Sequence, residues 1–384
     1  MIPYSRQSIN QDDIDAVVEV LKSDFLTQGK KVPAFENAIC DYTGSKYGVA
    51  VNSGTSALHI ACLSLGLTTG DILWTTPITF VASANCGLYC GAHVDFVDID
   101  TSAWNIDINC LKEKLIEADK NGHLPKVLIV VHMAGLPADM LEIHALSEQY
   151  GFSIVEDASH ALGATYLGKP VGSCQYSDIT VFSFHPVKSI TTGEGGMAVT
   201  NNQMLANRMR LFAGHGITKN SDLMNKEPDG EWYYQQIELG YNYRLSDIHA
   251  ALGISQLKRL DEFVQRRSAI ASVYDSSFEQ LPLQTPLKYD DRQSAYHLYP
   301  VLLEESAAVD RKQLFTQLRV KGIGAHVHYI PVHAQPYYQA KGFKLGDFRN
   351  AENYYNKVIS LPCFPELTKS NQEYVISSLS ELLA

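Results

Sequence analysis

Seven short apolar runs rich in β-branched residues recur between about residues 48 and 200, and the chain between them leaves room for helices. Alternating strands and helices are typical of a mostly parallel sheet covered on both faces. The runs are continuously apolar rather than strictly alternating, as expected for strands buried on both sides. The sequence therefore predicts an α/β fold with a seven-stranded, mostly parallel sheet. Its strands are expected at residues 48–52, 71–75, 93–97, 126–131, 152–156, 179–183 and 196–200.

The 384-residue length is too great for one ordinary core, so we expect two unequal domains. Residues 245–260 show helical apolar spacing with Ser246 and Asp247 as candidate caps, and the pattern continues through Phe263 and Tyr274 as one connecting helix. Beyond about residue 280, expected strands at 297–302 and 325–329 indicate a smaller α+β domain. This divides the chain into an N-terminal segment near the cleft (1–40), a large domain (41–255), and the connecting helix with a small C-terminal domain (256–384).

The net charge of -11 and pI near 5.6 provide no basic field for a polyanion, which argues against nucleic-acid binding. The seven scattered cysteines are typical of reduced thiols. Cys86 and Cys90 have the spacing of half a metal site, but no second pair completes it, so buried small residues are the preferred interpretation. With no signal-like start and no apolar run of ~20 residues, we expect a soluble cytoplasmic protein without a membrane partner.

Two residues after predicted strands indicate a specific cofactor. Asp157 follows the run 152–156, and Lys188 lies in the loop after 179–183, close to three glycines. Pyridoxal 5'-phosphate (PLP) needs a lysine for its aldehyde and an acid that keeps its pyridine nitrogen protonated. A loop lysine is usually only solvated, but the preceding strand, the small neighbours and Asp157 favour a catalytic lysine. We therefore predict a PLP site around these two residues.

The segment Asn52-Ser-Gly-Thr-Ser56 lies between a predicted strand and a helical run, where free backbone N–H groups can bind an anion. Gly54 would let a phosphate approach the backbone, and Ser183 lies five residues before Lys188, close enough to join it. Ser and Thr before a helix are also ordinary caps, so the motif alone favours a structural interpretation. Its position relative to Lys188 and Asp157 makes it a candidate phosphate site.

Several aromatic and histidine residues have two open interpretations each. Phe80, just past a strand, would stack on the pyridine ring or lie in the core. His160 would contact the ring or its hydroxyl, or be a core histidine. His326 and His328 would point the same way on a strand, and with His333 they suggest zinc ligands or a substrate or structural role. We prefer the second role, because no nearby carboxylate or cysteine completes a metal set.

The whole set of motifs resembles the DegT/StrS family of sugar aminotransferases, which are fold type I PLP enzymes. The resemblance covers nearly the whole chain. Among family members, the sequence is most similar to the aminotransferases of pseudaminic acid synthesis. The motifs that carry it are residues 26–29, 52–57, 76–80, 156–163, 182–188 and 240–245, and the finer likeness rests on 157–163, 297–300, 327–331 and 361–363.

This resemblance implies roles for individual residues. Lys188 would be the Schiff-base lysine and Asp157 the partner of the pyridine nitrogen. The phosphate would be bound by Thr55, Ser183 and the amide of Gly54, while Asn242 would reach the phosphate in the neighbouring subunit of a homodimer. Phe80 would be the stacking aromatic, and His160 stands where many relatives have Gln. Contacts with the substrate are expected from Lys30, His328 and Tyr329.

By the same resemblance, the protein would move an amino group from glutamate to C4 of a UDP-4-keto-6-deoxy-N-acetylhexosamine, giving UDP-4-amino-4,6-dideoxy-N-acetyl-beta-L-altrosamine. Alternatives are another nucleotide-sugar C4 or C3 aminotransferase, a PLP-dependent sugar dehydratase, or a non-catalytic nucleotide-sugar sensor. Dehydratases of this fold replace the lysine with histidine, so Lys188 argues against them. A sensor would be expected to lack Asp157 or Lys188, and both are present.

Overall fold

The computed structural model describes residues 1–383 and contains a seven-stranded sheet in the order β1-β9-β8-β5-β4-β2-β3. Strand β9 runs antiparallel to its neighbours β1 and β8, and the strands from β8 to β3 pair in parallel. Each predicted run is a strand, so the predicted sheet is confirmed. The strands are β1 (Tyr47–Val51), β2 (Ile72–Thr75), β3 (His93–Phe96), β4 (Val127–Val131), β5 (Ser153–Asp157), β8 (Ile179–Ser183) and β9 (Gly196–Thr200).

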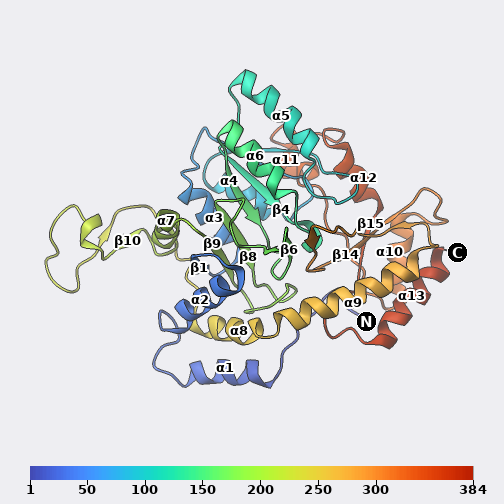
Figure 1. The fold of residues 1–384 in the computed structure, drawn as a ribbon, viewed down its shortest axis with the longest axis horizontal. Helices are drawn as coiled ribbons and strands as arrows, with labels where there is room; N and C mark the ends of the chain where they lie inside the picture. Colours follow the sequence, from blue (N-terminus) through green and yellow to red (C-terminus); the bar gives the residue numbers. More distant parts are fainter. Residues whose placement is uncertain (384) are drawn as a thin grey trace.

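Helices cover both faces of this sheet, as its buried strands require (Figure 1). One face packs on α3 (Gly54–Ser64), α4 (Ala82–Tyr89) and α7 (Gln203–Ala213). The other face packs on two pairs of helices, one at each end of the sheet. These are α2 (Lys31–Thr43) with α8 (Asp247–Leu257), and α5 (Ile108–Asn121) with α6 (Met140–Tyr150).

The connecting helix is interrupted, so the prediction of one continuous helix is wrong. Ser246 caps α8 as predicted, but α8 ends at Leu257 and α9 (Leu260–Phe278) follows as a second helix. At the break, Arg259 Nη2 pairs with the carboxylate of Asp13 in α1 (Gln11–Leu21) at 2.5 Å. This contact ties the junction to α1, while α9 continues past it toward the C-terminal part of the chain (Figure 1).

The C-terminal part builds a three-stranded antiparallel sheet, β12-β14-β15, with its own apolar core. The strand expected at 297–302 is β14 (Tyr299–Leu303), but the strand expected at 325–329 is wrong. The backbone of that segment pairs with β15 only at His326, opposite Ser360. The chain then leaves for the large sheet, where the Val332 N–H donates to Pro77 O at 2.8 Å. The domain boundaries at residues 40 and 255 stay predictions.

The remaining elements are short strands and peripheral helices. None of the helices in residues 1–383 is both long and apolar enough to cross a membrane. The seven cysteines are all free thiols. The further elements are β6 (Thr165–Tyr166), β7 (Lys169–Pro170), β10 (Ile217–Thr218), β11 (Gln235–Gln236), β12 (Leu283–Gln284), β13 (Arg292–Gln293), β15 (Val358–Leu361), α10 (Arg311–Val320), α11 (Pro336–Gln339), α12 (Arg349–Lys357), α13 (Lys369–Leu383), and the 3-10 turns η1 (Met133–Gly135), η2 (Ser221–Leu223) and η3 (Val332–Ala334).

Candidate active site

A pocket of about 440 Å³ lies where β5 and β8 end and α3 begins. This is the edge at which open α/β sheets bind ligands. A larger cavity of about 1100 Å³ lies beside the edge strand β3 and holds none of the predicted site residues. The smaller pocket is therefore the candidate active site. It brings together Gly54, Thr55, Phe80, Asp157, His160, Ser183, Lys188, His328 and Tyr329, whereas Lys30 and Asn242 lie outside it.

The start of α3 forms a cradle suited to a phosphate. Ser53 caps the helix by accepting a hydrogen bond from the Ser56 N–H at 3.1 Å, so the ordinary cap is present. The first N–H groups of a helix have no carbonyl partner within it, which leaves those of Gly54 and Thr55 for a ligand, and both residues line the pocket. Gly54 packs directly against Ser183, because a Cβ on Gly54 would lie 2.9 Å from the Ser183 Cβ. Cap and anion site therefore coexist here.

Asp157 is held firmly at the end of β5. The Ser83 hydroxyl donates to its Oδ2 at 2.6 Å, and the Ser159 N–H donates to its Oδ1 at 3.1 Å. Ser83 comes from α4, and its position in a small apolar helix gave no sequence signal of this contact. A fixed, buried carboxylate in the pocket wall fits the partner that a protonated pyridine nitrogen needs.

Lys188 is the amine of the pocket. Burial lowers the pKa of its ammonium to about 8, although the charge of Asp157 opposes this shift. The lysine lies in a tight turn after β8, in which its own N–H donates to His185 O at 2.9 Å. Gly193, at φ 82°, helps return the chain to β9. An amine with a lowered pKa is suited to nucleophilic and proton-transfer chemistry.

The remaining wall is aromatic and histidine-rich. Phe80 is 58% exposed and lines the pocket, so it is not a core residue. His160 is buried and its Nε2 lies 3.1 Å from the Tyr329 hydroxyl, while its Nδ1 has no partner. Burial, followed by the charges of Lys188 and His328, holds the pKa of His160 well below its ordinary value. His160 therefore lines the pocket, while its unpartnered Nδ1 is buried within the protein.

His328 and its neighbours complete this wall. Burial, with contributions from His326 and Lys188, lowers the pKa of His328 to about 3, and its Nδ1 lies 2.9 Å from Ser360 Oγ. Rings of His326 and His328 stack at 4.6 Å, and both pack on Tyr4, a pocket residue that the sequence did not reveal. His333 is separate: it is buried and bonds Glu352 at 3.0 Å. Among residues 1–383, no group of three or more His, Cys, Asp or Glu side chains is placed to hold a metal ion.

Asn242 and Lys30 are both exposed, away from the pocket of their own chain. Asn242 follows segment 217–239, which carries β10 and β11 and projects from the body of the molecule (Figure 1). Its apolar side chains are unusually open, with Trp232 76% and Leu239 75% exposed. Patches of this kind mark interaction surfaces.

The sheet order, together with a lysine, an acid and a helix N-terminus around one pocket, defines a fold type I PLP-dependent enzyme. The model of the DegT/DnrJ/EryC1/StrS aminotransferase family matches residues 7–380. The chain belongs to this family, and it is a PLP-dependent aminotransferase.

Relatives cover the whole chain. The UDP-4-amino-4,6-dideoxy-N-acetyl-beta-L-altrosamine transaminase of Campylobacter jejuni subsp. jejuni serotype O:23/36 (strain 81-176) is 43% identical, over 100% of this chain and 98% of that protein. The solved structure of Helicobacter pylori PseC, an aminotransferase involved in the biosynthesis of pseudoaminic acid, is 35% identical with a TM-score of 0.91, covering 100% and 99% of the two chains. The PLP-form of the putative sugar aminotransferase Spr1654 from Streptococcus pneumoniae is 28% identical with a TM-score of 0.89, covering 100% of both chains.

Proposed function

We propose that this aminotransferase moves an amino group from glutamate to C4 of a UDP-4-keto-6-deoxy-N-acetylhexosamine, giving UDP-4-amino-4,6-dideoxy-N-acetyl-beta-L-altrosamine. The observation that carries the proposal is the convergence of Lys188, Asp157 and the start of α3 in one pocket. The substrate is suggested by the 43% identical altrosamine transaminase, whose similarity spans the whole chain.

Lys188 is proposed as the proton carrier. PLP, when bound, supplies an electron sink that stabilises negative charge on the carbon bearing the amine. Lys188 Nζ would take the proton from Cα of glutamate and deliver it to C4′ of the cofactor. In the sugar half-reaction it would carry a proton the other way, from C4′ to C4 of the sugar. The pKa of about 8 supports this role, because about a tenth of the amine is unprotonated at pH 7, far more than at the ordinary pKa of a lysine.

Asp157 and the α3 cradle are proposed to hold the cofactor. Asp157 would accept a hydrogen bond from the protonated pyridine nitrogen and keep it charged, and hydrogen bonds from Ser83 and Ser159 maintain the orientation of the carboxylate. Thr55, Ser183 and the Gly54 amide bind the phosphate at the positive end of α3. Together these residues would hold the cofactor at its ring nitrogen and at its phosphate, in the pocket that Lys188 also lines.

The aromatic and histidine wall is proposed to bind the ring and the sugar. Phe80 would stack on the pyridine ring, and the His160 side chain would contact the ring hydroxyl. His328 and Tyr329 face the sugar. The lowered pKa of His328 supports a neutral imidazole there, which can exchange hydrogen bonds with sugar hydroxyls.

The working unit is proposed to be a homodimer with shared sites. Asn242 reaches the phosphate in the partner's pocket, and Lys30 contacts substrate across the same boundary, which accords with the exposure of both residues here. The open apolar side chains of segment 217–239 support burial against a second copy. Seven free thiols support a location in the reducing cytoplasm.

A substrate panel tests the proposed reaction. Purified enzyme and glutamate are incubated with 4-keto and 3-keto sugars carried on UDP or dTDP, and 2-oxoglutarate and the amino sugar are followed by mass spectrometry. The UDP-linked 4-keto-6-deoxy-N-acetylhexosamine is expected to be the best substrate, measured by kcat/KM. Preference for a 3-keto or dTDP-linked sugar would reject the proposed substrate, while leaving the aminotransferase class intact.

A further inference from the structure

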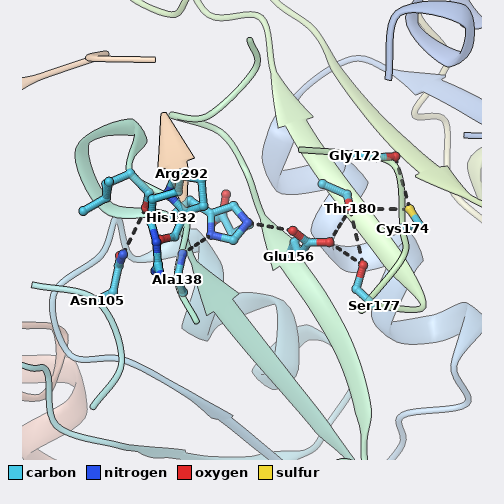
Figure 2. Close-up of polar contacts among 12 residues, drawn as sticks. Asn105, His132, Ala138, Glu156, Gly172, Cys174, Ser177, Thr180 and Arg292 are labelled. Carbon is cyan, nitrogen blue, oxygen red and sulfur yellow. Dashed lines mark hydrogen bonds and ion pairs between the residues drawn. The ribbon is translucent and has the colours of Figure 1, made fainter. Parts of the chain in front are cut away.

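We infer that Glu156, which faces away from the pocket, is a positioning residue for Asp157 through a buried network on the opposite face of the sheet. The inference rests on the proposed function, because it assumes that Asp157 partners the pyridine nitrogen. Glu156 and Asp157 are consecutive in β5, so their side chains point to opposite faces. Asp157 reaches Ser83 of α4, whereas Glu156 reaches His132, Ser177 and Thr180 (Figure 2).

The carboxylate of Glu156 is buried and fully engaged. His132 Nε2 lies 2.7 Å from its Oε2, and the hydroxyls of Ser177 and Thr180 both donate to its Oε1. Burial by itself raises the pKa of Glu156, but the hydrogen bond and the charge of His132, followed by the hydrogen bonds of the two hydroxyls, outweigh it and leave the pKa below its ordinary value. Glu156 is therefore ionised at neutral pH, although no lysine or arginine pairs with it in the described chain.

His132 is held in place as a hydrogen-bond donor to Glu156. The Ala138 N–H donates to His132 Nδ1 at 3.2 Å, so the ring proton is on Nε2 and points at Glu156. The loop that carries Ala138 is itself tied down, since Asn105 Nδ2 donates to Leu136 O and Arg292 Nη1 donates to Pro137 O, each at 3.0 Å (Figure 2).

The network acts on Asp157 through both neighbouring strands. The backbone N–H of His132, just past β4, donates to the carbonyl of Asp157 at 3.2 Å. On the other side, Thr180 of β8 stands opposite Glu156, and the next pair in register is Val181 opposite Asp157. Glu156, the residue before Asp157 in β5, thus links β5 to β4 and β8 next to the carboxylate of the pocket. A shift of β5 against either neighbour would move the Asp157 carboxylate away from its partner.

No ligand explains the buried charge. The cavity beside Glu156 on this face measures about 20 Å³, which is room for one water molecule. A buried carboxylate without a cationic partner is costly to keep. Its hydrogen bonds all lead to the segments that flank Asp157, which is why we assign it to positioning.

The test uses the PLP-loaded enzyme. Glu156→Leu removes the acceptor that His132, Ser177 and Thr180 share, whereas Glu156→Gln can still accept from His132 and donate to the two hydroxyls. For Glu156→Leu we expect the rate of the glutamate half-reaction to fall about 10- to 100-fold, which is the loss typical of residues that orient site residues. The KM for glutamate should change less than about 3-fold. Glu156→Gln should recover the rate to within about 3-fold of the parent enzyme.

A spectroscopic readout separates positioning from general destabilisation. Loss of the ring proton removes a positive charge that repels a proton at Lys188 Nζ, so the pH midpoint of the bound cofactor's absorbance should move upward in Glu156→Leu. Thr200→Val is the matched control: it deletes a buried hydroxyl of β9 that donates to Asp178 O at 2.6 Å, away from Asp157. It should lower the melting temperature and leave the midpoint in place.

The midpoint in Glu156→Leu and in its control decides whether Glu156 positions Asp157. An unchanged midpoint in Glu156→Leu, or an equal shift in Thr200→Val, would overturn the inference. If Glu156→Leu does not fold, Thr180→Val removes one donor to the same carboxylate and should move the midpoint upward by a smaller amount, and an unmoved midpoint again overturns it. Asp157→Asn is measured in parallel. If that variant leaves rate and midpoint unchanged, the proposed role of Asp157 fails; if it alone shifts them, only the Glu156 inference fails.

Discussion

Gly54 and Ser183, from the start of α3 and the end of β8, pack so closely that a Cβ on Gly54 would lie 2.9 Å from the Ser183 Cβ. Real Cβ contacts are longer, so any side chain at position 54 must push α3 away from β8. The phosphate cradle depends on that approach, because Thr55, Ser183 and the Gly54 amide have to reach one ligand.

Gly54→Ala is therefore expected to weaken PLP binding. Overpacking of this kind costs about 1–3 kcal/mol, so the dissociation constant for PLP should rise at least about 5-fold. Equilibrium titration of the cofactor-free protein by fluorescence measures it. Gly48→Ala is the control, since its Cβ would crowd Cys40 and Met197 at 3.2 Å away from the pocket. Equal losses of affinity in the two variants would contradict the cradle.

Lys188→Ala is expected to bind PLP but to lose turnover. Without the amine there is no covalent link and no proton carrier at Cα or C4, so the cofactor's absorbance should resemble that of the unlinked aldehyde. Absorbance spectra and a 2-oxoglutarate assay check both effects. Retention of full activity in this variant would reject Lys188 as the catalytic lysine.

The buried ammonium of Lys188 should also lower the free energy of unfolding of the cofactor-free protein. Its pKa falls from 10.5 to about 8 on folding, so the folded state binds fewer protons and the cost is fully present below pH 8. Stability should rise as the pH increases from 8 to 10.5. Lys188→Met should accordingly raise the free energy of unfolding by up to about 3 kcal/mol at pH 7, with a gain that shrinks toward pH 10.

Urea unfolding of the two proteins across this pH range measures that gain. Lys46→Met, at an exposed position, is the control and should show no comparable pH-dependent difference. A gain in Lys188→Met that stays constant with pH would mean that packing, rather than the buried charge, is responsible.

Mixed dimers test the role proposed for Asn242. Asn242→Ala and Lys188→Ala should each be strongly impaired alone. If Asn242 serves the partner, a mixed dimer has one site with Lys188 from one chain and Asn242 from the other, and activity should return to about half of the parent value per dimer. Differently tagged subunits, co-purified and assayed, give the result. No recovery in the mixed dimer would show that Asn242 acts within its own chain or not at all.

The sequence determined the large sheet and most of the site because both depend on local patterns. Continuous β-branched runs predicted every strand of the main sheet, since a strand buried on both faces needs no particular partner to be apolar. Asp157, Ser183 and Lys188 follow strand ends, and parallel strands bring their carboxyl ends to one edge.

Long-range contacts decided the rest. At the break before Leu260, Arg259 meets Asp13 of a distant helix. Residues 325–329 leave the small sheet, and the chain then makes a backbone bond to Pro77. Ser83 and Tyr4 lie in the site because of tertiary packing, and their spacing in the sequence gives no indication of it. The composition and strand order of the chain thus fixed the class of fold and the acid and amine of its site. Only the tertiary structure decided which buried groups hold that acid in place, namely Ser83 on one face of the sheet and the Glu156 network on the other. The reason is that hydrogen bonds between segments far apart in sequence form only in the folded chain.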